Sequence, residues 1–299
     1  GRAPVCWPGL WGVLTAHAVP GVEHADGQHH ERLVTTRHGA GVVRLLWPPQ
    51  HRGHIRVVLR LPRLDAVRPT IAAVRRWLDL DTDPVPIDRA LGSDRILGPL
   101  VGERPGLRVP GVVDGAEFAL FVVLGQQVSL AAARTLQARL VERFGAPALP
   151  EGGWKRIDPG VLAEAGPERL REALRLTRAK AQTLHALAVC LTNGLDLSAE
   201  SDPGEVRDRL LAVRGIGGWT SEFIAMRALG VPDACPAGDL VLARALGVRP
   251  GREVTLLAER WRPWRSYATM HLWTEESYLE ESAWRSAGNP FMPSSEGSR

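Results

Sequence analysis

The sequence predicts an α+β protein, in which a small antiparallel sheet domain with helices precedes an all-α domain. Two patterns support this fold class. Short runs rich in β-branched residues, separated by turn residues, gather in the first quarter of the chain. From about residue 86 the apolar residues recur with helical spacing instead. The length of 299 residues fits two domains or one compound domain. We place the domains at 1–85 and 86–288, followed by a loose tail at 289–299 that contains Pro, Ser and Gly.

The strands of the first domain are expected at 31–37, 41–47 and 54–61. The first two flank a hairpin-like turn at 38–40, and the third follows another break rich in Gly and Pro, so an antiparallel meander is the natural arrangement. Apolar residues at helical spacing then predict a helix at 67–80 that covers the sheet.

The second domain is expected to be helical throughout. An almost wholly apolar run at 117–125 predicts a buried helix. Ser129 can cap the helix that follows, and Gly145 can stop it. Further helices are expected at 178–194, 252–261 and 266–279.

The composition is that of an ordinary globular protein, with 44% apolar and 23% charged residues. The formal charge is +4 and the pI is about 9.4. Arginine supplies nearly all of the positive charge, and it suits bidentate phosphate contacts. Because a GC-rich genome produces the same bias, the charge gives only weak support for a nucleic-acid partner.

The three cysteines, Cys6, Cys190 and Cys235, are far apart in the sequence. They argue against a disulfide framework and against a four-cysteine metal or iron–sulfur site. A reducing, cytoplasmic compartment is therefore expected. The first residues lack the pattern of a signal peptide, and no apolar run approaches the ~18 residues of a membrane helix, so we expect no membrane partner.

The most informative segment is a helix-hairpin-helix pattern at 203–229. Asp202 and Glu205 fit a capping box, with Pro at the first helical position. The turn contains Gly215, Gly217 and Gly218. Glycine leaves the backbone N–H groups at the start of the second helix open to a phosphate. A helix–helix turn that merely needs small residues explains the same glycines, so both interpretations stay open for this segment alone.

Asp239 lies just beyond the hairpin and precedes an apolar run at 240–247 that is typical of a helix. An aspartate at this place is often an N-cap. The partial positive charge at a helix N-terminus also keeps a carboxylate ionised, so a capping role and a catalytic role are compatible.

Residues 202–247, which hold the glycine turn and Asp239, resemble the helix-hairpin-helix-Gly/Pro-Asp superfamily of base-excision DNA glycosylases. The wider pattern is similar to its 3-methyladenine DNA glycosylase II branch. Residues 123–140 resemble the helix pair that carries the intercalating loop of that branch. Residues 259–273 resemble its late signature around a base-pocket tryptophan, and residues 11–23 its N-terminal start. The resemblance covers nearly the whole chain.

The resemblance implies a monofunctional DNA glycosylase that flips an alkylated purine of the 3-methyladenine class out of double-stranded DNA and removes it, leaving an abasic site. Asp239 matches the catalytic carboxylate of the family. Cleavage of the N-glycosidic bond builds positive charge on the sugar, which a fixed carboxylate stabilises. The same group could orient or deprotonate the attacking water. An alkylated purine is already positively charged and leaves as a neutral base, so a strong general acid is less needed.

Trp219 stands where bifunctional members of the superfamily carry a Schiff-base lysine, so water is the expected nucleophile. The resemblance places Trp219 and Trp273 in the base pocket, with Phe223 sharing its wall. Aromatic rings hold a cationic base by cation–π stacking, worth roughly 0.5–2 kcal/mol per ring. Core packing is the alternative for each of these residues. It is the preferred interpretation for Trp77, Trp261 and Trp264.

Gln126 and Gln127 lie on the turn between two helices, where the branch often has a leucine in place of Gln127. A side chain inserted there fills the gap that a flipped base leaves in the duplex. A glutamine wedge could bond the orphaned partner base, and a polar turn residue is the alternative. Val13 stands where some members have a phenylalanine, which thins the aromatic cleft and leaves the substrate range open.

The resemblance also implies a structural monovalent cation bound by the backbone carbonyls of Leu211, Val213 and Ile216, and no other cofactor is expected. We expect a monomer. The alternative function is a non-catalytic helix-hairpin-helix domain that binds DNA within an alkylation-response protein, and a first residue other than Met leaves a longer parent protein open. Asp239 and the aromatic residues discriminate between the two, because a pure DNA binder needs neither.

Overall fold

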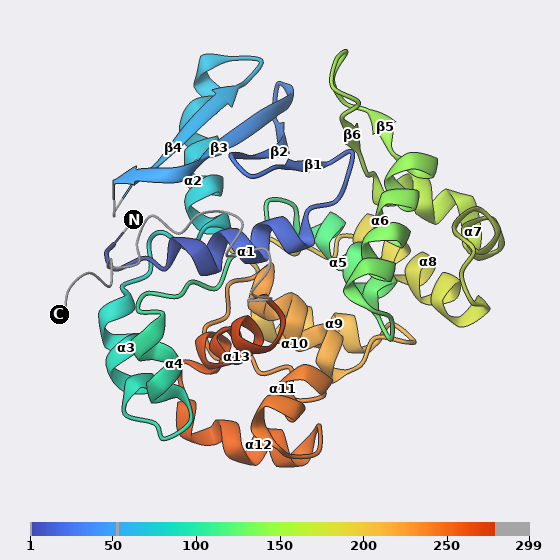
Figure 1. The fold of residues 1–299 in the computed structure, drawn as a ribbon. Helices are drawn as coiled ribbons and strands as arrows, with labels where there is room; N and C mark the ends of the chain where they lie inside the picture. Colours follow the sequence, from blue (N-terminus) through green and yellow to red (C-terminus); the bar gives the residue numbers. More distant parts are fainter. Residues whose placement is uncertain (1, 52–53, 279–299) are drawn as a thin grey trace.

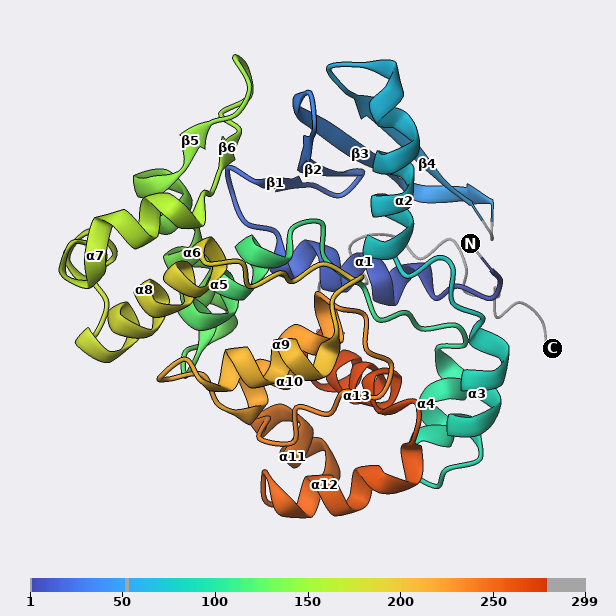
Figure 2. The same cartoon turned by 180° about the vertical axis from the view of Figure 1, so that it is seen from behind.

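The computed structural model describes residues 2–51 and 54–278. A small sheet occupies one end of the molecule and helices form most of the rest (Figures 1 and 2). This arrangement confirms the predicted α+β class. The predicted tail at 289–299 lies outside the described residues.

Four strands form the sheet in the order β1-β2-β3-β4, and every neighbouring pair is antiparallel. The predicted meander is therefore confirmed. The turn between β2 and β3 begins earlier than expected, at Arg37, because Thr36 pairs with Gly39. The strands are β1 (Glu23–Ala25), which was not predicted, β2 (His29–Thr36), β3 (Gly39–His51) and β4 (His54–Arg60).

Two helices pack with this sheet. The predicted covering helix is α2 (Val67–Trp77). An unpredicted helix, α1 (Trp7–His17), lies between the sheet and the helical part of the molecule (Figure 1). Leu10 and Leu14 of α1 join the core beneath the sheet, whereas Val13 joins the helical core. A helix that is apolar on two sides lacks the polar stripe that reveals an amphipathic helix in a sequence.

The helical part begins with α3 and α4, continues with a group formed by α5–α8, and ends with α9–α13 (Figures 1 and 2). Ser129 caps α6 by accepting from the Ala132 N–H, and Asp202 caps α9 by accepting from the Glu205 N–H, both as predicted. The unpredicted α7 contains Pro167, which obscures its pattern. The helices are α3 (Pro84–Gly92), α4 (Leu97–Glu103), α5 (Gly115–Gly125), α6 (Leu130–Phe144), α7 (Pro159–Leu174), α8 (Arg178–Thr192), α9 (Pro203–Leu211), α10 (Gly218–Arg227), α11 (Leu240–Leu246), α12 (Arg252–Ala258) and α13 (Arg265–Trp273).

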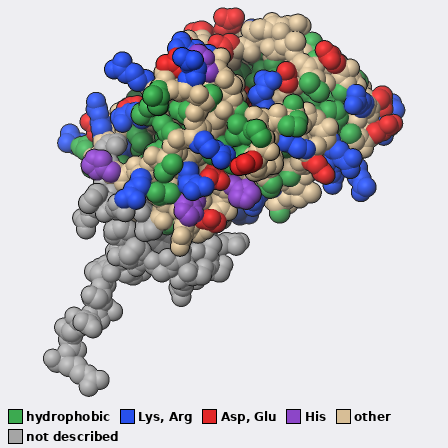
Figure 3. All heavy atoms as spheres, turned by 90° about the horizontal axis from the view of Figure 1, so that it is seen from above, with side chains coloured by type: hydrophobic (Ala, Val, Ile, Leu, Met, Phe, Trp, Pro, Cys, Tyr) green, Lys and Arg blue, Asp and Glu red, His purple; other side chains and the backbone are tan. Residues whose placement is uncertain are grey.

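Shorter elements complete the chain. They are the 3-10 turns η1 (Leu64–Ala66) and η2 (Glu259–Trp261), the π-helical turn η3 (Thr274–Tyr278), and a two-stranded ribbon of β5 (Ala146–Pro147) and β6 (Lys155–Arg156). Within the described ranges, no helix is long and apolar enough to cross a membrane. Seen from above the sheet, basic side chains (Lys or Arg) are interspersed with acidic ones across the described part of the face (Figure 3).

Candidate active site

A cavity of about 310 Å³ lies where α1, α5, α10 and the starts of α6 and α11 meet. Its lining includes the four residues that the sequence singled out for chemistry and base binding: Asp239, Trp219, Phe223 and Trp273. A larger cavity of about 780 Å³, between α2 and α13, contains none of these four. The convergence of side chains, and not cavity size, therefore identifies the candidate site.

Asp239 caps α11, because its Oδ1 accepts from the Leu242 backbone N–H at 2.8 Å. The same carboxylate also faces the cavity and accepts from two indoles. Trp219 Nε1 donates to Oδ2 at 2.9 Å, and Trp273 Nε1 donates to Oδ1 at 3.0 Å. Three N–H groups thus fix the orientation of one carboxylate, so capping and exposure to the cavity coexist in this residue.

The aromatic side chains form a continuous wall beside Asp239. The Phe223 ring lies 5.5 Å from the Trp219 ring, centroid to centroid, and 5.5 Å from the Trp273 ring, which it meets at 89°. Phe118 of α5 packs edge-on against Phe223 at 5.5 Å. Phe118 could not be distinguished from its neighbours in the sequence, because it stands in an almost wholly apolar run. Val13 is buried in the cavity wall and adds no ring there.

The three tryptophans for which the sequence favoured core packing do pack against the core. Trp77 and Trp261 are buried, and Trp264 is half-buried against the helical core. Trp77 also reaches the cavity lining from the sheet side.

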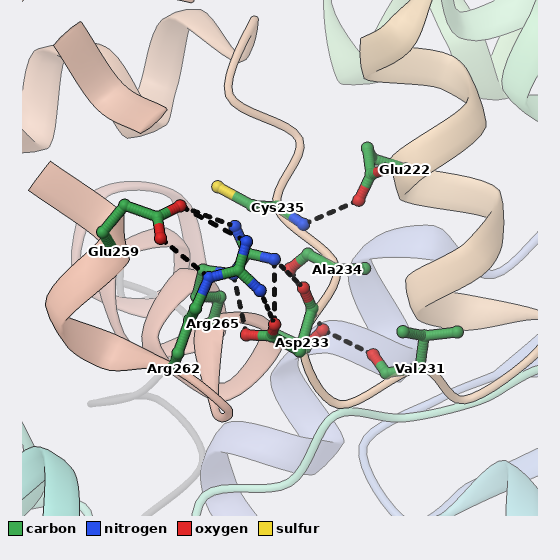
Figure 4. Close-up of polar contacts among 9 residues, drawn as sticks. Glu222, Val231, Asp233, Ala234, Cys235, Glu259, Arg262 and Arg265 are labelled. Atoms are coloured by element: carbon green, nitrogen blue, oxygen red, sulfur yellow. Dashed lines mark hydrogen bonds and ion pairs between the residues drawn. The ribbon is translucent and has the colours of Figure 1, made fainter. Parts of the chain in front are cut away.

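The loop that leads to Asp239 is tied to the end of the helical domain by a cluster of ion pairs (Figure 4). Asp233 accepts from Arg265 Nε at 2.7 Å and from Arg265 Nη2 at 2.9 Å, and it also pairs with Arg262. Glu259 accepts from Arg262 Nε at 2.8 Å. A bidentate arginine–carboxylate pair fixes geometry as well as charge, so this cluster restrains the loop before Asp239.

Backbone groups of the same loop are held by side chains of α10 and α13. The Cys235 N–H donates to Glu222 Oε2 at 2.9 Å. Ser266 Oγ donates to the Val231 carbonyl at 2.6 Å. Burial raises the pKa of the Cys235 thiol to about 11, so this thiol stays protonated near neutral pH and is a poor nucleophile.

The hairpin between α9 and α10 uses its glycines in two different ways. Gly215 has φ +94°, and an added Cβ would lie 2.0 Å from Thr183 Oγ1, so the fold itself requires glycine there. A Cβ on Gly217 or Gly218 would meet nothing within 4 Å. Packing explains Gly215, whereas the open space at Gly217 and Gly218 suits the approach of an external group.

The carbonyl groups suggested for a cation lie in the same hairpin. Leu211 ends α9, and the Val213 carbonyl accepts from the Ile216 N–H at 3.0 Å. Carbonyl oxygens at the C-terminal end of a helix carry partial negative charge, so the donor type fits a monovalent cation.

The side chains of the two glutamines in the α5–α6 turn have different surroundings. Gln127 is exposed at the tip with φ +57°. The amide of Gln126 instead donates to the Gly215 carbonyl at 3.1 Å and to Thr220 Oγ1 at 2.9 Å. A contact with DNA stays a prediction for both residues, but the Gln126 side chain already bonds to the hairpin.

The lining of the cavity also includes a set of titratable side chains that sequence reasoning missed. Arg32 of β2 donates to Glu117 of α5 at 2.6 Å, and burial raises the pKa of Glu117 to about 7 despite this bond. Burial, assisted by the Arg227 guanidinium, lowers the pKa of His17 to about 4. Arg227 lies over the rings of Phe118 and Phe223, at 5.6 and 5.9 Å. Its spacing of one helical turn from Phe223 was a usable signal. Arg32 and Glu117 are brought together only by the tertiary fold.

Comparisons with known proteins agree with this geometry. Residues 1–114 match the family model described as the AlkA N-terminal domain, and residues 120–248 match the HhH-GPD superfamily of base excision DNA repair proteins. The chain is 31% identical over 295 residues to DNA-3-methyladenine glycosylase 2 of Escherichia coli, covering 94% of this chain and 98% of that protein.

A second relative is longer than this chain. The chain is 43% identical over 281 residues to the probable bifunctional transcriptional activator/DNA repair enzyme AlkA of Mycobacterium tuberculosis, covering 91% of this chain and 55% of the relative. It therefore spans about half the length of that protein. The fold is similar to the 3-methyladenine DNA glycosylase structure from Archaeoglobus fulgidus, with a TM-score of 0.79, 23% identity, and coverage of 92% and 97%.

Proposed function

We propose, because the chain belongs to the HhH-GPD superfamily of base excision DNA repair proteins, that it is a monofunctional DNA glycosylase that removes alkylated purines from double-stranded DNA. One observation carries the proposal. The Asp239 carboxylate is held by two indole N–H groups inside an aromatic cavity, beside a hairpin in which Gly217 and Gly218 face open space. A protein that only grips the DNA backbone needs neither the carboxylate nor the aromatic wall.

The aromatic wall selects a positively charged base. A purine flipped into the cavity stacks on the indoles of Trp219 and Trp273, and a methylated purine brings the positive charge that such rings attract. Because both indoles donate a hydrogen bond to a carboxylate, their rings gain electron density and hold a cation more strongly. Ordinary bases lack the positive charge, so stacking on these rings stabilises them less.

Asp239 then acts on the sugar. As the glycosidic bond breaks, positive charge develops on the deoxyribose, and the fixed carboxylate stabilises it without having to reorganise. The same group is placed to orient the attacking water. The chain has two lysines. Lys180 donates to the Leu124 and Gln126 carbonyls, and Lys155 donates to the Glu142 carbonyl, so both are engaged outside the cavity lining. Water as nucleophile leaves an abasic site with both strands intact.

The hairpin and the α5–α6 turn place the enzyme on DNA. Backbone N–H groups at Gly217 and Gly218 bind a phosphate at the start of α10, and Gln127 enters the gap left by the flipped base. A monovalent cation on the carbonyls of Leu211, Val213 and Ile216 would add positive charge beside that phosphate. We further propose that the protein acts as a monomer and on DNA in the cytoplasm.

The proposal is tested by measuring the bases released from methylated duplex DNA, identified by mass, for the wild type and Asp239→Asn. Asparagine keeps the size of the side chain and an oxygen that can cap α11. We expect the wild type to release methylated purines and the variant to lose roughly 100-fold or more in rate, with DNA affinity kept within a few-fold. Tight DNA binding without base release by the wild type would support the non-catalytic alternative instead.

A further inference from the structure

Two segments that are far apart in the sequence meet at one glutamine side chain. Gln126 is the C-cap residue of α5, and its side-chain amide reaches the hairpin between α9 and α10. The amide donates to the Gly215 carbonyl at 3.1 Å and to Thr220 Oγ1 at 2.9 Å. Thr220 is buried in the first turn of α10. The α5–α6 turn and the hairpin are therefore joined directly.

Helix α8 is hydrogen-bonded to both segments. Lys180 Nζ donates to the Gln126 carbonyl at 2.7 Å and to the Leu124 carbonyl at 3.1 Å. One turn further along α8, Thr183 Oγ1 donates to the Arg214 carbonyl of the hairpin at 3.0 Å. The backbone of Gln126 and the backbone of the hairpin thus share one rigid support.

The residue that follows this link is in an unusual conformation. Gln127 has φ +57°, a left-handed backbone that side-chain-bearing residues rarely adopt, and its side chain is exposed. A backbone of this kind persists where the surrounding structure holds it. The bonds of Gln126 on one side of the tip supply that restraint.

We propose that Gln126 is a positioning residue that couples phosphate binding by the hairpin to the opening of the duplex by Gln127. This inference rests on the proposed function. Opening a base pair costs free energy, and contacts with the phosphate can supply it only if the link between the two segments is stiff. Gln126 provides the link, so it acts through Gln127 and has no contact of its own with the base.

The test compares one lesion in two duplexes. A single 7-methylguanine is paired with cytosine in the first duplex and faces an abasic site in the second, where flipping costs less. The variant is Gln126→Met, which keeps the length of the side chain and removes its hydrogen bonds. We expect release from the paired duplex to fall roughly tenfold, as for the loss of two neutral hydrogen bonds. Release from the duplex with the abasic site should fall less than about threefold, because little opening remains to be driven.

Two further variants make the result specific. Thr220→Val removes one of the two bonds while keeping the shape of the side chain, and it should show the same selective loss in smaller measure. If Gln126→Met fails to fold, Thr220→Val serves as the test variant in its place. The matched control is Arg139→Met, which removes a bond of α6 to the Leu174 carbonyl at 2.8 Å, away from the hairpin. It should leave both rates unchanged.

The outcomes separate this inference from the proposed function. Equal losses on the two duplexes, or no loss on either, would overturn the coupling role of Gln126 while leaving the glycosylase assignment intact. A wild type that releases the base from neither duplex would count against the proposed function, and the inference would fall with it.

Discussion

Replacing Gly215 and Gly217 by alanine, one at a time, distinguishes a glycine that the fold requires from a glycine that is expected to be required for DNA binding. At Gly215 an alanine must adopt φ +94°, which costs about 1–2 kcal/mol. Its Cβ would also lie 2.0 Å from Thr183 Oγ1. Moving Thr183 aside disturbs the hydrogen bond that its single hydroxyl proton shares between the Ala179 and Arg214 carbonyls, both at 3.0 Å, at about 1 kcal/mol. The expected loss of unfolding free energy is therefore about 2–3 kcal/mol.

Gly217→Ala should behave differently. Gly217 has φ −105°, and its added Cβ meets open space, so the unfolding free energy should change by less than about 0.5 kcal/mol. Urea unfolding, read as a change of midpoint at constant slope, measures both values. In the double variant Gly215→Ala with Thr183→Ala, removal of the hydroxyl should recover part of the loss.

DNA binding supplies the other half of this prediction. Gly217→Glu places a negative charge where a phosphate is expected, so it should weaken binding to all sequences alike. The plot of log affinity against log salt has a negative slope, and the variant should make this slope less steep by about 0.9, the value for one lost phosphate contact. Unchanged affinity of Gly217→Glu, or equal destabilisation by alanine at both glycines, would refute this division of roles.

Three further predictions concern the active site. Borohydride should trap no covalent adduct with lesion-containing DNA, because both lysines are bonded to backbone carbonyls elsewhere; efficient trapping would contradict the monofunctional assignment. Trp219→Phe removes the donor to Asp239 Oδ2, a bond to a charged group worth about 1.5–3 kcal/mol, so excision should slow roughly 10- to 100-fold. Trp264→Phe, outside the cavity, is its control, and equal rates for the two variants would exclude a positioning role of the indole. Because the pKa of His17 falls from 6.5 to about 4 on folding, it contributes stability above pH 6.5 that is lost as the pH drops towards 4. His17→Asn should weaken the dependence of the unfolding free energy on pH over that interval. An unchanged slope of unfolding free energy against pH would contradict the presence of a neutral His17 imidazole in the folded protein.

The sequence was informative where a local pattern is sufficient. Helix caps such as Asp202 act within one turn, so spacing reveals them. The convergence of Asp239, Trp219 and Trp273 follows from no local pattern; the family resemblance anticipated it, and the hydrogen bonds now describe it. The structure adds that Asp239 caps α11 and faces the cavity at once. The sequence could treat these roles only as compatible.

What the sequence could not reveal depends on contacts between distant segments. Helix α1 is apolar on two sides, so its periodicity carries no signal. Gln126 and Gln127 are neighbours of the same residue type, and only the position of the hairpin gives one of them a bonding partner. The pair of Arg32 and Glu117 joins a strand to a helix that lies far along the chain. No spacing rule connects these two residues.

The central claim is that the Asp239 carboxylate stabilises positive charge on the sugar, and binding of an uncharged and a cationic abasic-site analogue tests it most directly. Duplexes carrying a tetrahydrofuran or a protonated pyrrolidine at one site differ in little but charge. The wild type should prefer the cationic duplex by at least about tenfold, equivalent to about 1.4 kcal/mol, and Asp239→Asn should abolish that preference while binding the uncharged duplex normally. An equal preference in the wild type and the variant would contradict the claim.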